Sequence, residues 1–514
     1  MKTLLIYFSL FFLFFFSSCE AFQELENIED VSVESSWALP LVNSTVALED
    51  FLQSYQEDAS LLVDDEGLLY FEYDQELFSQ SGKSLLDQLA ASFPTAIPVL
   101  LPDMELPAGI PGGVAFDLLD LKAGKLSFGF SSAHDKPLSI DLVFPELQKE
   151  GEALRFSTLS LPAWDGAGTK PSYSNASTPM ALEGYQMLTP EGKFSIRYTA
   201  IDADGTEVLL ENFVVNFQDL GFSKAQGYFG QVSLEGGEGE LALEFFRDRL
   251  NGGAISFATP SVTLVSDNSL GLPSRVQVNR FDVLTTEGVT LSLESDLTGQ
   301  DLDIPYPALA AMGSAVAGTF RLDHLNSNLP ELLSSRPVAI HYDITALANP
   351  DADTGIRGFL TDSSNLNLSM EVSLPFHGSL TDFSARDTIE IDPGSFDAFD
   401  EASFKLVTDN TLPLELTLQG YFVDDNFNVL NTLLEEPLAL VKAAEVDDNG
   451  LSTVTNTTIT ELAYNQEKFE SIKPATRLIL ELTFATADAG SRAAKIYNYQ
   501  DVGIRMGAIL TKFK

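Results

Sequence analysis

Side chains that commonly perform chemistry are scarce in this chain of 514 residues, which has four histidines and one cysteine. The histidines are His134, His324, His341 and His377, and no two of them have the i, i+4 spacing of a helical zinc site. The sequence also lacks a Gly-x-Ser-x-Gly nucleophile elbow, a phosphate-binding loop and a dinucleotide fingerprint. We therefore predict a protein that is not an enzyme and that uses no cofactor.

Two acidic turns are candidates for a weak calcium site. Asp202 and Asp204 stand at alternate positions before a glycine, and so do Asp351 and Asp353. Alternating carboxylates before a glycine begin the kind of loop that binds Ca²⁺, a cation that prefers oxygen ligands. Neither turn has the full ligand set or the distal glutamate, so the tip of an ordinary hairpin explains the same residues. No other metal site is expected.

Carboxylates are so abundant that no glycosidase pair of acids can be singled out. The two tryptophans, Trp37 and Trp164, are few for a groove that stacks sugars. An enzyme directed at polysaccharides therefore remains only a second alternative.

Acidic residues dominate the charge, because 75 Asp and Glu oppose 29 Lys and Arg and leave a net charge of −46. Affinity for nucleic acid depends on Lys and Arg that displace counterions, so a nucleic-acid partner is excluded. Direct adhesion to anionic lipid is disfavoured for the same reason.

The single cysteine, Cys19, directly follows an apolar run at residues 3–16. This run has the length of a signal-peptide core and is shorter than the about 20 residues of a transmembrane helix. Two small residues precede Cys19, and the arrangement resembles the bacterial lipobox, although Phe16 stands where leucine is commonest. In a lipobox, a diacylglyceryl group is attached to the cysteine thiol, and cleavage makes that cysteine the new N-terminus.

The lipobox resemblance implies that lipidated Cys19 attaches the mature chain to a membrane. A plain secretory signal explains the same run without lipidation. The phenylalanine-rich run and the acidic residues behind it also resemble lipoproteins of Bacteroidetes-type Gram-negative bacteria, in which such residues favour export to the outer leaflet. We therefore expect a protein that is lipid-anchored to the outer membrane and exposed at the cell surface, with a periplasm-facing anchor as the alternative.

Beyond the N-terminal region, short stretches of alternating apolar and polar residues indicate β-strands. Examples are 126–130 and 239–246, and turn signals such as Asp65-Glu66-Gly67, Asp204-Gly205, Glu287-Gly288 and Asn449-Gly450 separate such stretches. Helical spacing is rare, and its best case is 84–93, which ends before Pro94. The sequence predicts a mainly β protein with a few short helices. Residues 502–513 alternate like the last strand of an outer-membrane barrel, a fold that the shortness of the other strands disfavours.

An internal repeat divides the β region. Residues 262–278 and 404–418 align at an Asp-Asn pair and at a Leu-Pro pair, and a weaker copy lies at 126–142. In each copy the second strand keeps the same phase after the proline, and shared phase is evidence of a shared fold.

The pattern of strand, Asn-containing turn, Leu-Pro and strand is similar to the opening hairpin of late-embryogenesis-abundant type 2 (WHy-like) modules and of tubular lipid-binding modules. This resemblance implies tandem β-sandwich modules, either Ig-like or of the tubular lipid-binding kind. The expected organisation is a lipoprotein signal peptide (1–18), an acidic linker (19–35), an N-terminal segment (36–115) and three β units (116–250, 251–395 and 396–514).

The sequence thus predicts a membrane-anchored, non-catalytic cell-envelope lipoprotein that serves as a scaffold for binding, adhesion or accessory functions. Its partners would be envelope proteins, glycan or lipid. The first alternative is a lipid-binding or lipid-transfer lipoprotein, in which the apolar faces of the β units enclose a hydrophobic tunnel.

Overall fold

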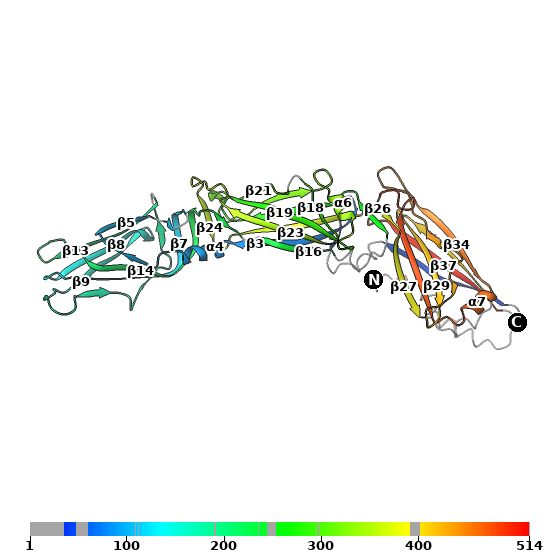
Figure 1. Cartoon of the computed structure of the whole chain (residues 1–514), viewed down its shortest axis with the longest axis horizontal. Coiled ribbons are helices and arrows are strands. Elements are labelled where there is room, and N and C mark those ends of the chain that lie inside the picture. The colour runs from blue at the N-terminus through cyan, green and yellow to red at the C-terminus, as the bar shows by residue number, and fades with distance from the viewer. Residues whose placement is uncertain are drawn as a thin grey trace.

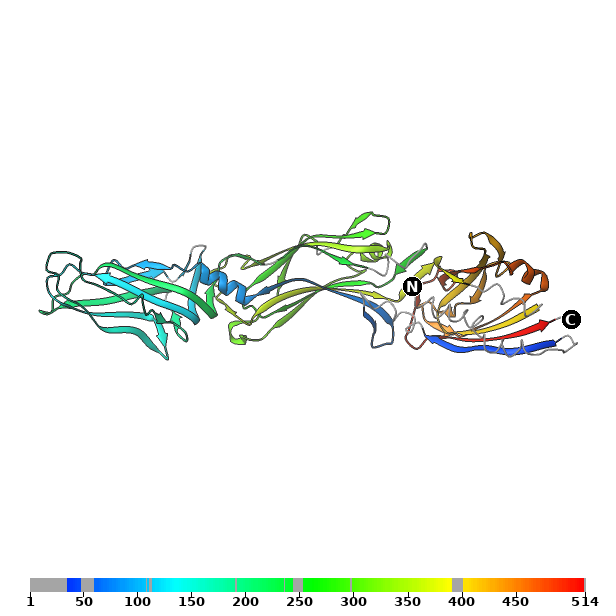
Figure 2. The ribbon, with the colours of Figure 1, turned by 90° about the horizontal axis from the view of Figure 1, so that it is seen from below.

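The protein is a row of three β-rich lobes, as two perpendicular views of its computed structural model show (Figures 1 and 2). The structure describes residues 35–47, 60–107, 109–110, 113–189, 192–234, 236–243, 253–295, 298–390 and 401–512. The predicted fold class, mainly β with tandem sandwiches and a few short helices, is confirmed.

The lobe at one end of the row, here called the distal lobe, is built from one continuous stretch of chain. Its elements are α4 (Gly82–Ala91), β4 (Ala96–Pro98), β5 (Asp103–Pro107), β6 (Gly109–Ile110), β7 (Val114–Ser131), β8 (Leu138–Lys149), β9 (Glu152–Leu161), β10 (Ser172–Ser174), β11 (Met180–Ala181), β12 (Gln186–Leu188), β13 (Lys193–Asp202) and β14 (Glu211–Tyr228). One layer pairs β7 with β14, the other pairs β8 with β9 and β13, and β12 pairs with both β7 and β8.

The middle lobe combines two early strands with a later stretch of chain. Its elements are β2 (Ser60–Val63), β3 (Leu69–Ser81), β15 (Val232–Ser233), β16 (Gly237–Ala242), β18 (Ser261–Asn268), β19 (Ser274–Thr285), β20 (Thr290–Ser292), β21 (Asp301–Ile304), η3 (Leu309–Ala311), β22 (Val316–Leu322), α6 (Leu329–Ser334), β23 (Pro337–Ala348), β24 (Gly358–Thr361) and β25 (Asn365–Pro375). One sheet has the order β2-β3-β25-β18-β22, and the other is centred on β19 and β23.

The C-terminal lobe joins the first described strand to the last. Its elements are β1 (Ser35–Ala47), β27 (Phe383–Glu390), β28 (Glu401–Asn410), β29 (Leu414–Val423), β30 (Val429–Thr432), β31 (Leu438–Val441), β32 (Glu445–Val446), β33 (Ser452–Val454), β34 (Asn456–Tyr464), α7 (Gln466–Ile472), β35 (Arg477–Thr486) and β37 (Asp501–Lys512). The sheet β1-β37-β28-β34 lies opposite the sheet β27-β35-β29-β30.

Residues 36–115, expected as a separate N-terminal segment, supply strands to all three lobes. Strand β1 pairs with β37 in the C-terminal lobe, and β3 pairs with β25 in the middle lobe. Strand β5 pairs with β13 in the distal lobe. The chain therefore passes along the whole row once before the repeated units begin.

Each repeat copy is a crossover between the two layers of a sandwich. Strand β18 pairs with β22 and β25, whereas β19, which follows the turn, pairs with β23 in the opposite sheet. In the same way, β28 pairs with β37 whereas β29 pairs with β35, and β7 pairs with β14 whereas β8 pairs with β13. The hairpin implied by the sequence resemblance is therefore wrong, because the two strands of a copy pair with other strands and not with each other.

Buried polar side chains close the crossover turns. The Oδ1 atom of Asn268 accepts a hydrogen bond from the Leu270 N–H at 2.9 Å, and Asn410 accepts one from the Leu412 N–H at the same distance. Both asparagines are 0% exposed. In the distal copy the hydroxyl of Ser132 accepts from the N–H two residues later, at 3.1 Å. The three copies thus have similar bonds at their turns, as their predicted equivalence would require.

A second bond pair repeats in the middle and C-terminal lobes. The Ser269 hydroxyl donates to the Asn365 carbonyl and accepts from the Asn365 N–H, at the start of β25. Thr411 makes the same two bonds with Asp501, at the start of β37. Each crossover is thus attached to the neighbouring strand of its own sheet.

The distal and middle lobes share a continuous core. Strand β24 pairs with the end of β14, so a middle-lobe strand extends the distal sheet. Helix α4 lies at this junction with Leu85, Leu86 and Leu89 buried, and it begins after an N-cap at Ser81. The helix predicted over 84–93 is therefore confirmed, with a start two residues earlier.

A close backbone contact adds to this junction. Gly271 and Phe359 exchange backbone hydrogen bonds of 3.0 and 3.1 Å. A Cβ atom on Gly271 would lie 2.1 Å from the Phe359 ring, so only glycine fits at this position.

The middle and C-terminal lobes meet at a smaller contact. Strands β17 (Ala254–Phe257), β26 (His377–Thr381) and β36 (Ala494–Lys495) form a short sheet between them. A separate apolar cluster contains Leu69 from the middle lobe with Leu412 and Ile496 from the C-terminal lobe.

The buried asparagine of the crossover generates a stability prediction. We expect Asn268→Ala to lower the local unfolding free energy of the middle lobe by about 2–4 kcal/mol, because the Leu270 N–H and the Pro305 carbonyl lose their buried partner. Hydrogen exchange of the β18 and β25 peptides measures this change. The exposed neighbour Asp267→Asn is the control and should change exchange very little. Equal exchange in wild type and Asn268→Ala would contradict the role of the crossover.

Candidate functional site

The Asp202 carboxylate closes the turn between β13 and β14. Its Oδ1 atom accepts hydrogen bonds from the backbone N–H groups of Asp204 and Thr206, both at 2.9 Å. Its Oδ2 atom lies 3.1 Å from His134 Nε2 and 3.8 Å from Lys136 Nζ. These partners, the Thr206 N–H first among them, lower the pKa of Asp202 to about 2.

A lysine stands where a calcium ion would be expected at this turn. Lys136 forms ion pairs with Asp204 and with Asp202, the two candidate ligands. Its ammonium group therefore supplies the positive charge that the two carboxylates require, and the pKa of Lys136 is raised, chiefly by the bond to Asp204.

The second candidate turn is paired with an arginine. Asp351 lies 3.0 Å from the guanidinium of Arg275, which also contacts Asp303 at 2.6 Å. Asp353 accepts a hydrogen bond of 2.8 Å from the Gly355 N–H in its own loop. Within the described residues, no three His, Cys, Asp or Glu side chains gather as a metal site would require. Weak calcium binding at either turn stays a prediction.

The two acidic turns occupy equivalent places in the repeat, which the sequence analysis missed. Each follows the strand that pairs with the second repeat strand: β13 in the distal lobe and β23 in the middle lobe. In the C-terminal lobe the equivalent strand, β35, leads to Asp488-Ala489-Gly490. The recurring Asp-Ala pattern is the signal that could have identified these turns as parts of the fold.

The bonding of Asp202 also recurs in hairpins that were never metal candidates. Asp64, Asp424 and Asp447 each accept hydrogen bonds from the N–H groups two and four residues later. Three of the four predicted glycine turns close such hairpins, and their glycines, Gly67, Gly205 and Gly450, have a positive φ. The fourth glycine, Gly288, also has a positive φ, and there the Thr285 hydroxyl takes the place of the aspartate by accepting from the N–H four residues later. An aspartate in this position therefore serves the turn.

The other three histidines, all within the part of the chain that the structure describes, have separate surroundings. His341 lies 3.4 Å from Glu240, His324 is exposed, and burial lowers the pKa of His377 with a further contribution from Lys495. Cys19, the predicted lipidation site, lies outside the described residues.

A polar groove of about 530 Å³ lies on the outer face of the distal lobe, where β10, β7 and β14 run side by side. Phe128 and Phe130 of β7 are buried in the core, so the alternate residues of this strand face the groove. The polar side chains that line it are Ser127, Ser131, Thr169, Lys170, Ser172, Ser174, Asn212 and Asn216. No local motif predicts this groove, because its residues come from three strands far apart in sequence.

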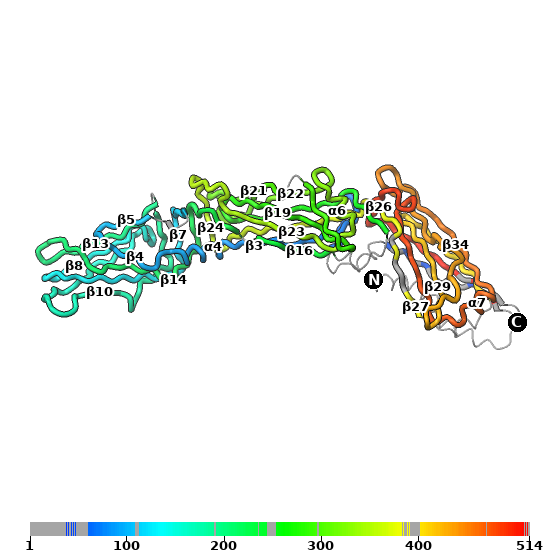
Figure 3. The backbone as a smooth tube through the Cα atoms, in the orientation of Figure 1, coloured from blue at the N-terminus to red at the C-terminus, as the bar shows by residue number. Residues whose placement is uncertain are grey.

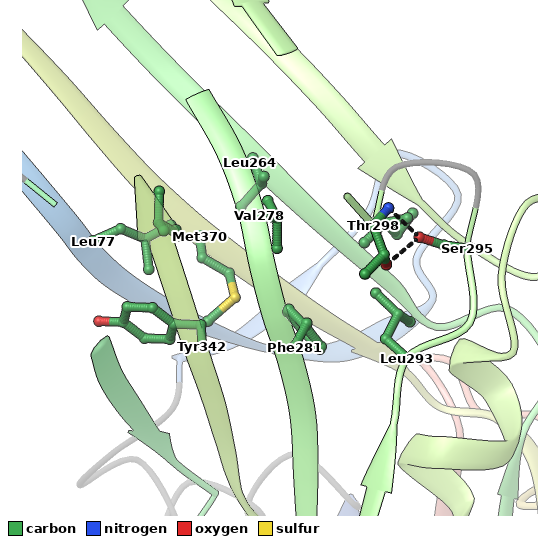
Figure 4. Close-up of a pocket in the computed structure, with 11 residues that line it drawn as sticks. Leu77, Leu264, Val278, Phe281, Leu293, Ser295, Thr298, Tyr342 and Met370 are labelled. Carbon is green, nitrogen blue, oxygen red and sulfur yellow. Dashed lines mark hydrogen bonds between the residues drawn. The ribbon is translucent and has the colours of Figure 1, made fainter. Parts of the chain in front are cut away.

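A small apolar cavity lies between the two sheets of the middle lobe (Figure 4). Val278, Phe281, Tyr342 and Met370 are among the residues around it. The volume of the cavity that is open to water is only about 10 Å³, which is roughly the room that one water molecule needs. This cavity is far too small for an acyl chain.

No protein-family model matches the chain, and no curated protein matches it. Among solved structures it is similar to a protein of Parabacteroides distasonis presumed to be secreted, with a TM-score of 0.34 and 12% identity over 93% of this chain and 99% of that chain. It is also similar to the infectious bursal disease virus VP2 subviral particle, with a TM-score of 0.15 and 12% identity over 84% of this chain and 77% of that one. Likenesses of this size support no argument about function.

Among the described residues, no helix has the length and apolar character needed to cross a membrane.

The lowered pKa of Asp202 generates a pH prediction. Its carboxylate titrates near pH 2 in the folded chain against an ordinary value of 3.8, so its stabilisation is full above that ordinary value and is lost as pH falls towards 2. We expect Asp202→Asn to melt below wild type at pH 7, because the ion pair with Lys136 and the carboxylate's charge at its backbone N–H partners are lost, and to approach wild type near pH 2. Melting curves between pH 2 and pH 7 test this, with Asp267→Asn as the exposed control. If the melting temperatures of wild type and Asp202→Asn differed by the same amount at every pH in this range, the proposed role of the Asp202 carboxylate would be contradicted.

Proposed function

We propose that the protein is a non-catalytic lipoprotein of the cell envelope, anchored to the outer membrane through Cys19, which holds a binding lobe away from the bilayer. The observation that supports this proposal is the position of β1, the described strand nearest to Cys19 in sequence. Ser35, the first residue of β1, pairs with Lys512 near the end of β37. Strand β37 ends at the outer end of the C-terminal lobe, opposite the distal lobe, so β1 begins at that same end (Figures 2 and 3).

The reach of the tether fits this arrangement. The segment between Cys19 and Ser35 spans at most about 55 Å, even when fully extended. The bilayer would therefore be nearest the C-terminal lobe, and the middle and distal lobes would follow along the row. The net charge of −46 would also oppose close contact between the lobes and anionic lipid.

The contacts of His134, Asp202 and Lys136 favour a binding protein over an enzyme. His134, Asp202 and Lys136 are engaged with one another and with backbone N–H groups, so they stabilise the turn. The pKa of Asp202 is low, whereas a general acid or base near neutral pH would need a raised one. No observation favours the polysaccharide-directed enzyme.

The lipid-transfer alternative receives no support from the middle lobe. A tunnel between its sheets would need room for an acyl chain, and the cavity there holds about one water. Leu264, Val278 and Met370, which line the cavity from both sheets, are therefore explained as core residues.

Replacement of the predicted lipidation site tests the proposed anchoring. We expect Cys19→Ser to move most of the protein from the membrane fraction to the soluble fraction, because the acyl chains that hold it are not attached. Metabolic labelling with an alkyne fatty acid should mark wild type and leave the variant unmarked. Ser18→Ala, which changes the neighbouring small residue and keeps the thiol, is the matched control. Membrane retention of Cys19→Ser would overturn the anchor.

A further inference from the structure

We propose that the polar groove on the distal lobe is a binding site for an uncharged glycan chain. The groove is open to solvent, and it presents hydroxyl and amide groups, which recognise the hydroxyl groups of sugars by hydrogen bonding, beside the rings of Phe128, Phe130 and Tyr173. The inference goes beyond anchoring, because it names the ligand class and the surface that would bind it.

Ser127 supplies a hydroxyl at the floor of the groove that a ligand could use. Ser127 is 4% exposed, and the described residues provide no hydrogen-bond partner for its side chain, although it lines the groove. Water that enters the groove can reach this hydroxyl, and a ligand that displaces such water must replace its hydrogen bonds. A sugar hydroxyl in the groove would be such a partner.

The shape of the floor depends on a glycine and a bulge. Gly129 lies between Ser127 and Ser131 on the same face of β7, and it leaves that part of the floor without a side chain. Opposite it, the register of β14 shifts between Glu211 and Val214. Asn212 within this bulge has a φ of 50° and donates a hydrogen bond of 3.0 Å to the Ser131 hydroxyl. Bulges of this kind redirect side chains beside binding sites.

The strand pairing argues against a peptide ligand. Strand β7 is paired on one side with β10 and on the other with β14, and β14 is paired further with β4. Added peptide strands bind through free backbone groups at a sheet edge, and the groove is a sheet face whose backbone groups are already paired. Side-chain hydroxyls and amides are what remain for a ligand.

The charge of the groove argues for an uncharged ligand. Among its lining residues Lys170 is the one charged side chain, and it forms an ion pair with Glu211 next to the groove. The same ammonium group lies 5.8 Å from the ring of Trp164, so an aromatic surface adjoins this end. A polyanion would meet no unpaired cation here and a strongly negative protein around it.

A glycan-binding assay on the mature chain tests the proposal. We expect binding to at least one uncharged polysaccharide in a panel of glucans, mannans, galactans and xylans, measured by affinity electrophoresis and calorimetry. Polygalacturonate and heparin are the charged comparators and should bind more weakly. The assay needs no lipid, so its failure would leave the anchoring through Cys19 unaffected, and failure of the anchoring would leave this result unaffected.

Variants locate the site. Ser127→Ala and Asn216→Ala should each weaken binding by about 2- to 12-fold, the worth of one hydrogen bond. Ser172→Trp should block the groove and abolish binding, whereas Ser160→Trp, on the exposed face of β9, should bind like wild type. Unchanged melting temperatures show that the variants are folded. Absence of binding across the whole panel, preference for the polyanions, or unchanged affinity in Ser172→Trp would each overturn the proposal.

Discussion

The buried crossover between the two layers of each sandwich is the interaction on which this structure depends. A strand that leaves one sheet and enters the opposite one must place its backbone N–H and carbonyl groups inside the core, where water cannot satisfy them. Asn268 and Asn410 supply the missing donors and acceptors, and the Ser132 hydroxyl supplies an acceptor. The strands before and after each turn then keep their apolar faces towards a common core.

The sequence predicted local structure well, because local structure follows from periodicity and turn chemistry. Alternation located the strands, the glycines at positions such as Gly67 and Gly450 marked hairpins, and the apolar face of 84–93 marked the helix. Pairing partners could not be read in this way. The pairing of β1 with β37 joins residues about as far apart as the chain allows, and alternation shows only that a strand has a buried face.

The candidate sites show the same contrast between local features, which the sequence predicts, and long-range contacts, which it does not. Asp202 and Asp204 were identified from their spacing. In the structure their carboxylates form ion pairs with Lys136, and Asp202 also accepts hydrogen bonds from backbone N–H groups. The sequence could not reveal this, since Lys136 belongs to a different turn. The groove was missed altogether, because Ser127 and Asn216 become neighbours only when β7 and β14 pair. Sites assembled across strands leave no local signal.

The arrangement of the lobes connects the fold to the proposed role. A tether that joins the outer end of the C-terminal lobe leaves the distal lobe at the far end of the row, together with its groove (Figure 1). The shared core at the first junction and the apolar cluster at the second connect neighbouring lobes. A large acidic surface would keep such a row away from anionic lipid and from other copies of itself.

The orientation of this row relative to the bilayer tests the central claim most directly. Because Cys19 is the only cysteine of the sequence and would be acylated in the anchored protein, single fluorophores can be attached at Ser160→Cys in the distal lobe and at Glu467→Cys in α7. Energy transfer to acceptor lipids in reconstituted vesicles then reports the distance of each lobe from the membrane. The account predicts strong transfer from position 467 and little from position 160. Equal transfer from both positions, or stronger transfer from position 160, would contradict it.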